Sequence, residues 1–216
     1  MKKIKFVYWN VAARAQPAML MLNAANIDYE WDYETANKWP ESKPNMPFNQ
    51  LPVIYDENDT IIAQSGTITR YCAKIAKLLP DMALSCAKTE MIMDQTNDIY
   101  NLMVKCKYAG DDTAQENAWK EFKEKQLHEK LIPLNNLLTN KFYGGQIPDA
   151  ADICVFSIIN LIVRSGIKDC LMQYKKLYDH YTSVYLTGNI KDYVKKNPKV
   201  YFVYKEKKSD VLSSQQ

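Results

Sequence analysis

The chain has 216 residues, of which 47% are hydrophobic and 25% charged, and its formal net charge is +3. This composition predicts a globular protein with a sizeable core, in one large or two small domains, and excludes long disordered segments. The small net charge and the lack of an apolar run long enough to span a bilayer indicate neither a nucleic-acid nor a membrane partner.

The cysteines and the N-terminus favour a cytoplasmic protein. Five cysteines are scattered along the chain without a CxxC pair, which argues against a disulfide framework and against a zinc site. The apolar run that follows Met1-Lys2-Lys3 is brief and aromatic and ends at Asn10, unlike a secretory signal. We therefore expect reduced thiols and no metal requirement.

The opening of the chain alternates between strand and helix patterns. Residues 5–9 are rich in strand formers, residues 14–25 follow a helical period, and residues 27–33 alternate aromatic with acidic side chains as a strand does. Residues 35–48 are polar and broken by prolines, which predicts a long irregular surface loop. Loops of this length in compact domains usually carry function.

Pro52 stands at the first position of the next predicted strand, where a missing N–H is tolerated and a cis Leu51–Pro52 bond is favoured. A cis bond there leaves the N–H and C=O of Leu51 free to pair with an extended peptide. After a short strand near Thr60, Ser65 begins a predicted helix whose first N–H groups form an anion site. A ligand with a peptide middle and a carboxylate end fits both features. The alternative is an edge-strand proline followed by an ordinary serine cap.

Beyond residue 84 the sequence shows helical periodicity and no strand pattern. The predicted helices cover residues 85–106, 113–138, 149–163, 169–181 and 190–197, and Asp149 caps the third of them with Asp152 in its first turn. The order β-α-β, loop, β-β-α in the first part is the thioredoxin-like arrangement. We predict an α/β thioredoxin-like domain at residues 1–78, a linker at 79–84, an all-α helical domain at 85–205 and a loose polar tail at 206–216.

Several motifs follow one another along the chain in a specific order: Val7-Tyr8-Trp9-Asn10 with Arg14-Ala15, Lys38-Trp39-Pro40-Glu41-Ser42-Lys43, Pro47-Phe48-Asn49-Gln50-Leu51-Pro52, Gln64-Ser65 with Arg70-Tyr71, and Asp149-Ala150-Ala151-Asp152. In this order they resemble the soluble glutathione S-transferases, above all the sigma class that includes glutathione-dependent prostaglandin D synthases. The resemblance implies a thioredoxin-like domain that holds glutathione as a substrate. It also implies that the helical domain forms much of the pocket for a second, electrophilic substrate.

Tyr8 resembles the family's catalytic tyrosine, whose hydroxyl donates a hydrogen bond to the glutathione sulfur. Arg14 resembles the arginine that keeps the field near that hydroxyl positive. The alternatives are a tyrosine that packs a strand and an arginine that faces solvent from a helix.

The resemblance also implies binding residues. The glutathione-binding residues are Trp39, Lys43, Gln50, Leu51, Pro52, Gln64 and Ser65, with Asp98 contributed by a partner subunit. The residues that line the second-substrate pocket, besides Tyr8, are Ala12, Ala13, Tyr100, Met103 and Lys105. A tryptophan stands near the position of Lys105 in the prostaglandin synthases, so general conjugation is the better prediction.

A homodimer is implied, with Phe48 as an aromatic key that inserts into the partner; the alternative is a loop aromatic folded onto its own subunit. Asp94 and Asp98 are four residues apart, so on a helix they face one way and repel, which suits a site or an interface. Some sigma enzymes bind a divalent cation here with a third acid. Because this chain has Asn97 in its place, we predict no metal.

Two other functions remain open on the sequence. A glutathione-dependent isomerase of the prostaglandin D synthase type, or a peroxidase, uses the same thiolate on another substrate. A non-catalytic relative, like the lens crystallins or the ligand carriers, keeps the fold without turnover.

Overall fold

Four strands form one mixed sheet in the N-terminal part of the chain. The computed structural model describes residues 3–196, 199–202 and 204. In the order β3–β1–β4–β5, the strands are Tyr29–Asp32, Ile4–Val7, Val53–Tyr55 and Ile61–Ala63. β1 pairs with β3 in parallel and with β4 antiparallel, and β5 pairs antiparallel with β4. All four strands were predicted.

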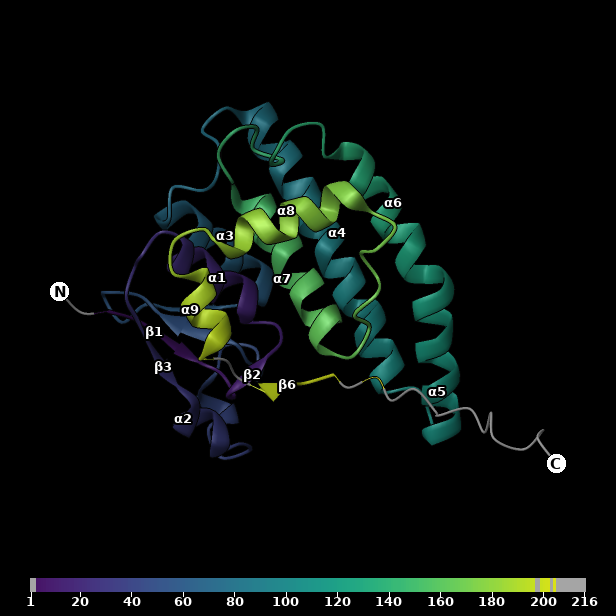
Figure 1. The fold of residues 1–216 in the computed structure, drawn as a ribbon. Helices are drawn as coiled ribbons and strands as arrows, with labels where there is room; N and C mark the ends of the chain where they lie inside the picture. The colour runs from purple at the N-terminus through teal and green to yellow at the C-terminus, as the bar shows by residue number, and fades with distance from the viewer. Residues whose placement is uncertain (1–2, 197–198, 203, 205–216) are drawn as a thin grey trace.

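Two helices pack on one face of this sheet, α1 (Gln16–Ala24) and α3 (Ser65–Ile75) (Figure 1). Phe6 and Ile54, which are paired across β1 and β4, are fully buried beneath them. α1 begins with a proline in its first turn, where the missing N–H is not needed. Burial of these large side chains fixes the register, because a slip by one residue would turn each of them to the other face.

The remainder of the described chain is mainly helical. Its elements are α4 (Ala83–Lys107), α5 (Asp112–Glu121), the π-helical turn η2 (Phe122–Gln126), α6 (Leu127–Leu137), α7 (Ala150–Arg164), α8 (Lys175–Tyr185) and α9 (Ile190–Lys195). α7 lies in the middle and packs against α1, α4 and α8 (Figure 1). Residues 150–162 are all buried, including the polar Asp152, Ser157 and Asn160. No helix in the described ranges is long and apolar enough to cross a bilayer.

The sheet and the helices share one core. Phe6 and Leu20 from the first part belong to the same buried cluster as Ile153 and Phe156 of α7. The backbone N–H of Ala150 also donates to the carbonyl of Leu78, 2.9 Å away, across the predicted linker. The predicted boundary at residues 79–84 therefore separates two kinds of secondary structure that pack on each other.

Three predictions of secondary structure need correction. A parallel pairing of β2 (Val11–Ala12) with β6 (Lys199–Val200) places a strand where none was expected. The predicted loop contains the end of α2 (Tyr33–Asn37) and the 3-10 turn η1 (Lys43–Asn45). Two-residue strands and single helical turns are too short to show a period. The predicted helix at 169–181 begins only at residue 175, and the predicted tail at 206–216 lies outside the described residues.

Candidate functional site

A cavity of about 470 Å³ opens beside the turn that precedes β4. Its lining residues are Trp9, Arg14, Trp39, Asn49, Gln50, Leu51, Pro52, Gln64 and Ser65. Most of the residues predicted to bind glutathione thus meet around one hollow. The Leu51–Pro52 bond is cis, as predicted. Lys43 does not line the cavity, but its Nζ lies 5.9 Å from the centre of the ring of Trp39, which does.

The N-terminus of α3 faces this cavity without a cap of its own. Ser65 is the first helical residue, and the preceding Gln64 has a φ of 70°. None of the described side chains caps the helix, and no acidic residue stands in its first turn. The first N–H groups of a helix have no intrahelical partner and favour negative charge. This end of the cavity is therefore suited to a carboxylate.

Tyr8 directly follows β1, and its side chain is 5% exposed at the wall of a second cavity of about 630 Å³. Burial raises the pKa of Tyr8 to about 12, against the opposing effect of the backbone N–H and the charge of Arg14. The phenol therefore stays protonated at neutral pH and is able to donate a hydrogen bond. A phenol with this pKa can donate a hydrogen bond at neutral pH but does not act as a base.

Arg14 connects the two cavities, because it lines both. Its guanidinium donates to Oδ1 of Asn101 at 3.2 Å and lies 4.6 Å from the centre of the Tyr100 ring. The alternative of a solvent-facing helix residue is therefore wrong: Arg14 precedes α1 and is held against α4. Its positive charge lies beside the space that Tyr8 borders.

Aromatic residues make up five of the eleven that line the second cavity. Its lining residues are Tyr8, Trp9, Asn10, Val11, Arg14, Asn37, Leu51, Tyr100, Val104, Tyr108 and Tyr201. Tyr100 was predicted, whereas Val104, Tyr108 and Tyr201 were not. Val104 on α4 and Tyr108, which directly follows α4, come four and eight residues after Tyr100, a spacing that favours one helix face and that the sequence already displays.

Four of the predicted second-substrate residues lie elsewhere. Ala12 and Met103 are fully buried in the core, and Lys105 is exposed on another face of α4. Met103 and Lys105 adjoin Val104 on α4, so each points about 100° to one side of it. Ala13 is buried and borders a separate small cavity.

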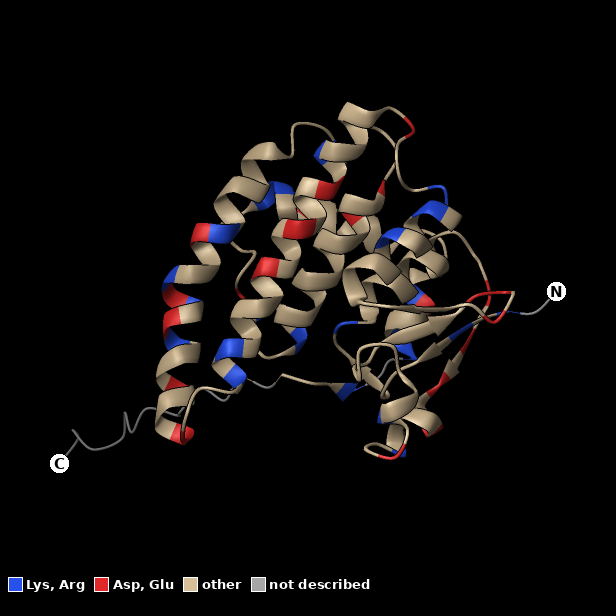
Figure 2. Ribbon diagram, turned by 180° about the vertical axis from the view of Figure 1, so that it is seen from behind, with Lys and Arg blue, Asp and Glu red and all other residues tan. Residues whose placement is uncertain are grey.

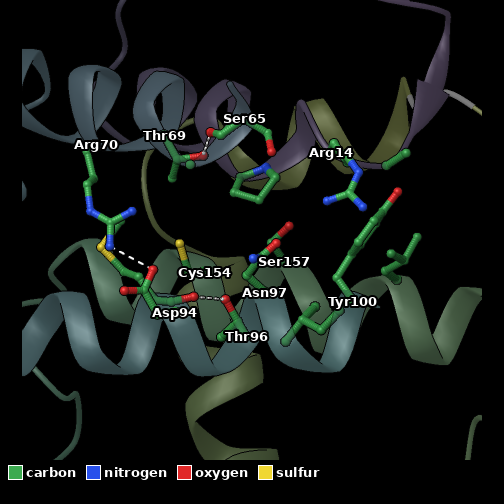
Figure 3. Close-up of a pocket in the computed structure, with 16 residues that line it drawn as sticks. Arg14, Ser65, Thr69, Arg70, Asp94, Thr96, Asn97, Tyr100, Cys154 and Ser157 are labelled. Atoms are coloured by element: carbon green, nitrogen blue, oxygen red, sulfur yellow. Dashed lines mark hydrogen bonds and ion pairs between the residues drawn. The ribbon is translucent and has the colours of Figure 1, made fainter. Parts of the chain in front are cut away.

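That small cavity, of about 80 Å³, lies between α3, α4 and α7 (Figure 3). At one end Arg14 lies beside Tyr100, and at the other Arg70 reaches from α3 to Asp94 on α4 with an N–O distance of 2.7 Å. Cys154 borders it from α7. Burial raises the pKa of the Cys154 thiol to about 12, so this thiol is not a nucleophile at neutral pH.

The acidic residues of α4 each have a cation in the same chain. Glu90, Asp94 and Asp98 are spaced four residues apart along the helix, and Figure 2 shows acidic segments in red among the helices. Arg70 pairs with the first two, and Lys130 lies 3.8 Å from Asp98. These cations offset the repulsion expected between acids four residues apart. The described residues contain no group of three or more His, Cys, Asp or Glu side chains that could hold a metal ion.

Comparison with known proteins identifies both parts of the chain. Residues 4–74 match the family model "Glutathione S-transferase, N-terminal domain", and residues 97–197 match "Glutathione S-transferase, C-terminal domain". Glutathione S-transferase 4 of Caenorhabditis elegans is 28% identical over 90% of this chain and 96% of its own length. Hematopoietic prostaglandin D synthase of Mus musculus is 28% identical over 92% and 98%. The structure of monomeric Na-GST-3 from Necator americanus, a glutathione S-transferase with 20% identity, superposes with a TM-score of 0.79 over 93% of this chain and 100% of that one.

Proposed function

Because the chain belongs to the glutathione S-transferase family, we propose that it ionises the thiol of glutathione through Tyr8 and transfers the thiolate to electrophilic small molecules. The observation that supports this most is the pair of adjoining cavities, which share Trp9, Arg14 and Leu51. One cavity contains an uncapped helix N-terminus, and the other is bordered by a protonated phenol. A tripeptide thiol extended along the first presents its sulfur to the second.

Glutathione fits the first cavity in one direction. Its γ-glutamyl carboxylate binds the N–H groups at the start of α3, beside Ser65 and Gln64. Its peptide middle pairs with the backbone of Leu51. Its glycine carboxylate meets Trp39 and Lys43, whose indole N–H and ammonium group are suitable donors.

The energy required of Tyr8 is modest. A free thiol has a pKa of about 8.5, and lowering it by about two units stabilises the thiolate by about 2.7 kcal/mol. A hydrogen bond to a charged group contributes about 1.5–3 kcal/mol. One donor from Tyr8 together with the positive charge of Arg14 is therefore sufficient. The thiol proton passes to solvent, the thiolate forms a carbon–sulfur bond, and the leaving group departs with the electron pair of the broken bond.

The proposal includes a homodimer in which Asp98 reaches the glutathione of the partner subunit. Asp98 borders none of the cavities described above, and its side chain is 61% exposed despite the contact with Lys130. Phe48 is 59% exposed on its loop, which contradicts the alternative that it folds onto its own subunit. Light scattering tests the dimer. A measured mass equal to one chain would overturn it and would make the protein a monomer, as Na-GST-3 is described to be.

Replacing the phenol tests the proposed chemistry. We expect Tyr8→Phe to lower the rate of conjugation of a chlorodinitrobenzene about 100-fold, because the thiolate loses its donor. The variant should still bind to a glutathione resin. Tyr178→Phe, an exposed tyrosine on α8, is the matched control and should match the wild type. Unchanged turnover in Tyr8→Phe would remove Tyr8 from its role.

The similarity to a prostaglandin D synthase keeps one second candidate, a glutathione-dependent isomerase or peroxidase. Both reactions use the same thiolate on an oxygen–oxygen bond. Turnover of an organic hydroperoxide in the absence of conjugation would favour this candidate. Retention on the resin without any turnover would instead indicate a non-catalytic carrier.

A further inference from the structure

Asn101, a residue of α4 that the sequence analysis did not single out, holds the guanidinium of Arg14. The side-chain oxygen Oδ1 of Asn101 accepts from Nη2 of Arg14 at 3.2 Å. The preceding residue, Tyr100, places the centre of its ring 4.6 Å from the central carbon of the same guanidinium. A guanidinium carries only donors, so an amide can hold it only through its oxygen. Two consecutive residues of α4 therefore fix the position of one positive charge.

A second arginine, Arg70, contacts α4 through carboxylates instead. It donates from Nε to Glu90 at 2.8 Å and from Nη2 to Asp94 at 2.7 Å. Figure 3 shows this arginine at one end of the small cavity and Arg14 beside Tyr100 at the other. At one end of the cavity the positive charge is thus paired with two acids, whereas at the other end it is held by a neutral amide.

The charge of Arg14 has no carboxylate beside it. Within the described part of the chain its guanidinium forms no ion pair, and α4 has no acidic residue after Asp98. Asp98 itself lies 3.8 Å from Lys130. Among the described residues that line the first and second cavities, Arg14 is the only one whose side chain is charged at neutral pH. It therefore supplies the positive field in both.

This field reaches the phenols around the second cavity. Burial raises the pKa of Tyr8 and of Tyr100, and the positive charge of Arg14 acts in the opposite direction on both. The other titratable side chains described along this cavity are the phenols of Tyr108 and Tyr201. Phenols are uncharged near neutral pH, so these four do not offset the charge of Arg14.

The choice of an amide at position 101 matters, because an opposite charge within about 4–6 Å moves a pKa by about 1–3 units. An asparagine orients a guanidinium without compensating its charge. An aspartate would orient it equally well, but its negative charge would cancel much of the attraction between Arg14 and a thiolate. Asn101 borders none of the cavities described above, so it acts through Arg14.

We propose that Asn101 is a positioning residue that holds Arg14 beside the glutathione sulfur and leaves the positive charge of the guanidinium available to the thiolate. This inference rests on the proposed transferase function, in which Tyr8 donates to the same thiolate. It adds no chemical step, since the proton of the thiol still passes to solvent. The amide oxygen fixes the direction of the guanidinium, and the neutrality of the amide sets how strongly the guanidinium favours the ionised thiol.

Two substitutions separate orientation from charge. Asn101→Asp has the same shape and keeps the acceptor but adds a negative charge, and an aspartate beside a guanidinium stays ionised above about pH 4. Asn101→Leu has a similar size and no acceptor. At saturating glutathione we measure kcat/KM for chlorodinitrobenzene against pH, and the ultraviolet absorbance of the thiolate of bound glutathione over the same range. The matched control is Asn117→Asp, which adds the same charge at an exposed position on α5.

We expect Asn101→Asp to raise the midpoint of both pH profiles by about one unit. Below the midpoint this shift lowers kcat/KM about tenfold, whereas well above it the rate should return to about that of the wild type. A merely structural role would lower the rate at every pH and leave the midpoint in place. An unmoved midpoint in Asn101→Asp, or an equal shift in Asn117→Asp, with wild-type turnover present, would overturn this inference and leave the proposed function intact.

Asn101→Leu keeps the charge of Arg14 and frees its guanidinium. We expect kcat/KM to fall about fivefold, the effect of one hydrogen bond, with a smaller displacement of the midpoint than in Asn101→Asp. Wild-type kinetics in this variant would show that Arg14 is held without Asn101 and would overturn the inference. A wild-type protein that never ionises bound glutathione would instead overturn the proposed function, and this inference with it.

Discussion

Two helix N-termini in this protein have opposite surroundings. At α7, Asp149 accepts from the N–H groups of Ala151 and Asp152 at 2.8 and 3.4 Å, and the Asp152 side chain accepts from the N–H of Asp149 at 2.8 Å. At α3, which begins at Ser65, no described side chain caps the helix. The α3 terminus opens into the cavity of about 470 Å³. The described side chains cap the first terminus and leave the second uncapped.

Burial explains why the two termini differ. Asp149 and Asp152 are buried, and an N–H left without a partner there would cost about 1–3 kcal/mol. Gln64, Gly66 and Thr67 at the start of α3 are exposed, so solvent can reach this helix end. A helix N-terminus without a side-chain cap is therefore tolerated at the surface.

The largest expected effect is at the N-terminus of α7, called the closed terminus here because side chains cap it. The Asp152 side chain also accepts from the N–H groups of Tyr143 and Gly144 and from His180 Nε2, 2.7 Å away. Both members of the Asp152–His180 pair are fully buried. Asp152→Ala should therefore lower the free energy of unfolding by about 3–5 kcal/mol, measured by urea denaturation.

The control for this variant is an aspartate that contacts a basic side chain at the surface. Lys175 and Asp179 are 2.7 Å apart and largely exposed. Asp179→Ala should change the free energy of unfolding by less than about 0.5 kcal/mol. Equal effects of the two substitutions would contradict the structural role assigned to the buried pair.

At the N-terminus of α3, the open terminus, one substitution should raise the stability of the protein and weaken its binding of glutathione. Thr67→Asp places an acid in the first turn of α3, which should stabilise the protein by about 0.3–1 kcal/mol. The same charge repels a ligand carboxylate and should weaken glutathione binding about tenfold, measured by calorimetry. Thr67→Asn is the neutral control of equal shape. If Thr67→Asp binds glutathione as tightly as Thr67→Asn, the carboxylate does not lie at this terminus.

A separate expected effect concerns the pH dependence of the closed terminus. Burial and then the charge of Asp152 raise the pKa of Asp149 to about 6, against a hydrogen bond from Thr89. Since the unfolded carboxyl has a pKa of about 3.9, the folded protein binds this proton more tightly. The stability that Asp149 contributes is therefore complete below about pH 4 and declines as the pH rises through 6.

Asp149→Asn should remove this decline and remain within about 1 kcal/mol of the wild type at pH 7, because asparagine also caps helices well. Urea denaturation between pH 4 and 7 measures both quantities. A variant whose stability falls with pH as steeply as that of the wild type would show that another group titrates.

Much of the first cavity was predictable from local sequence. A proline before a strand indicated the cis bond at Pro52, and the position of Ser65 indicated the start of α3. Asp149 with Asp152 three residues later indicated the capping box of α7. Each of these features depends on residues within one turn or one bond of each other, so a short stretch of chain contains all the information.

The second cavity was predicted poorly, because its walls come from distant parts of the chain. Tyr201 meets Tyr108 only through the pairing of β6 with β2, a strand pair too short to show a period. His180 likewise meets Asp152 only when α8 packs on α7.

The sequence by itself determined the four strands of the main sheet, the starts of α3 and α7 and the cis bond at Pro52, because backbone geometry and side-chain periodicity are local, whereas the binding residues were implied by the resemblance to a family. Only the tertiary structure decided which face of α4 borders the second cavity and that Tyr201, near the C-terminus, lines it. Those outcomes depend on how helices and strands pack over long separations in sequence, and no short segment encodes that packing.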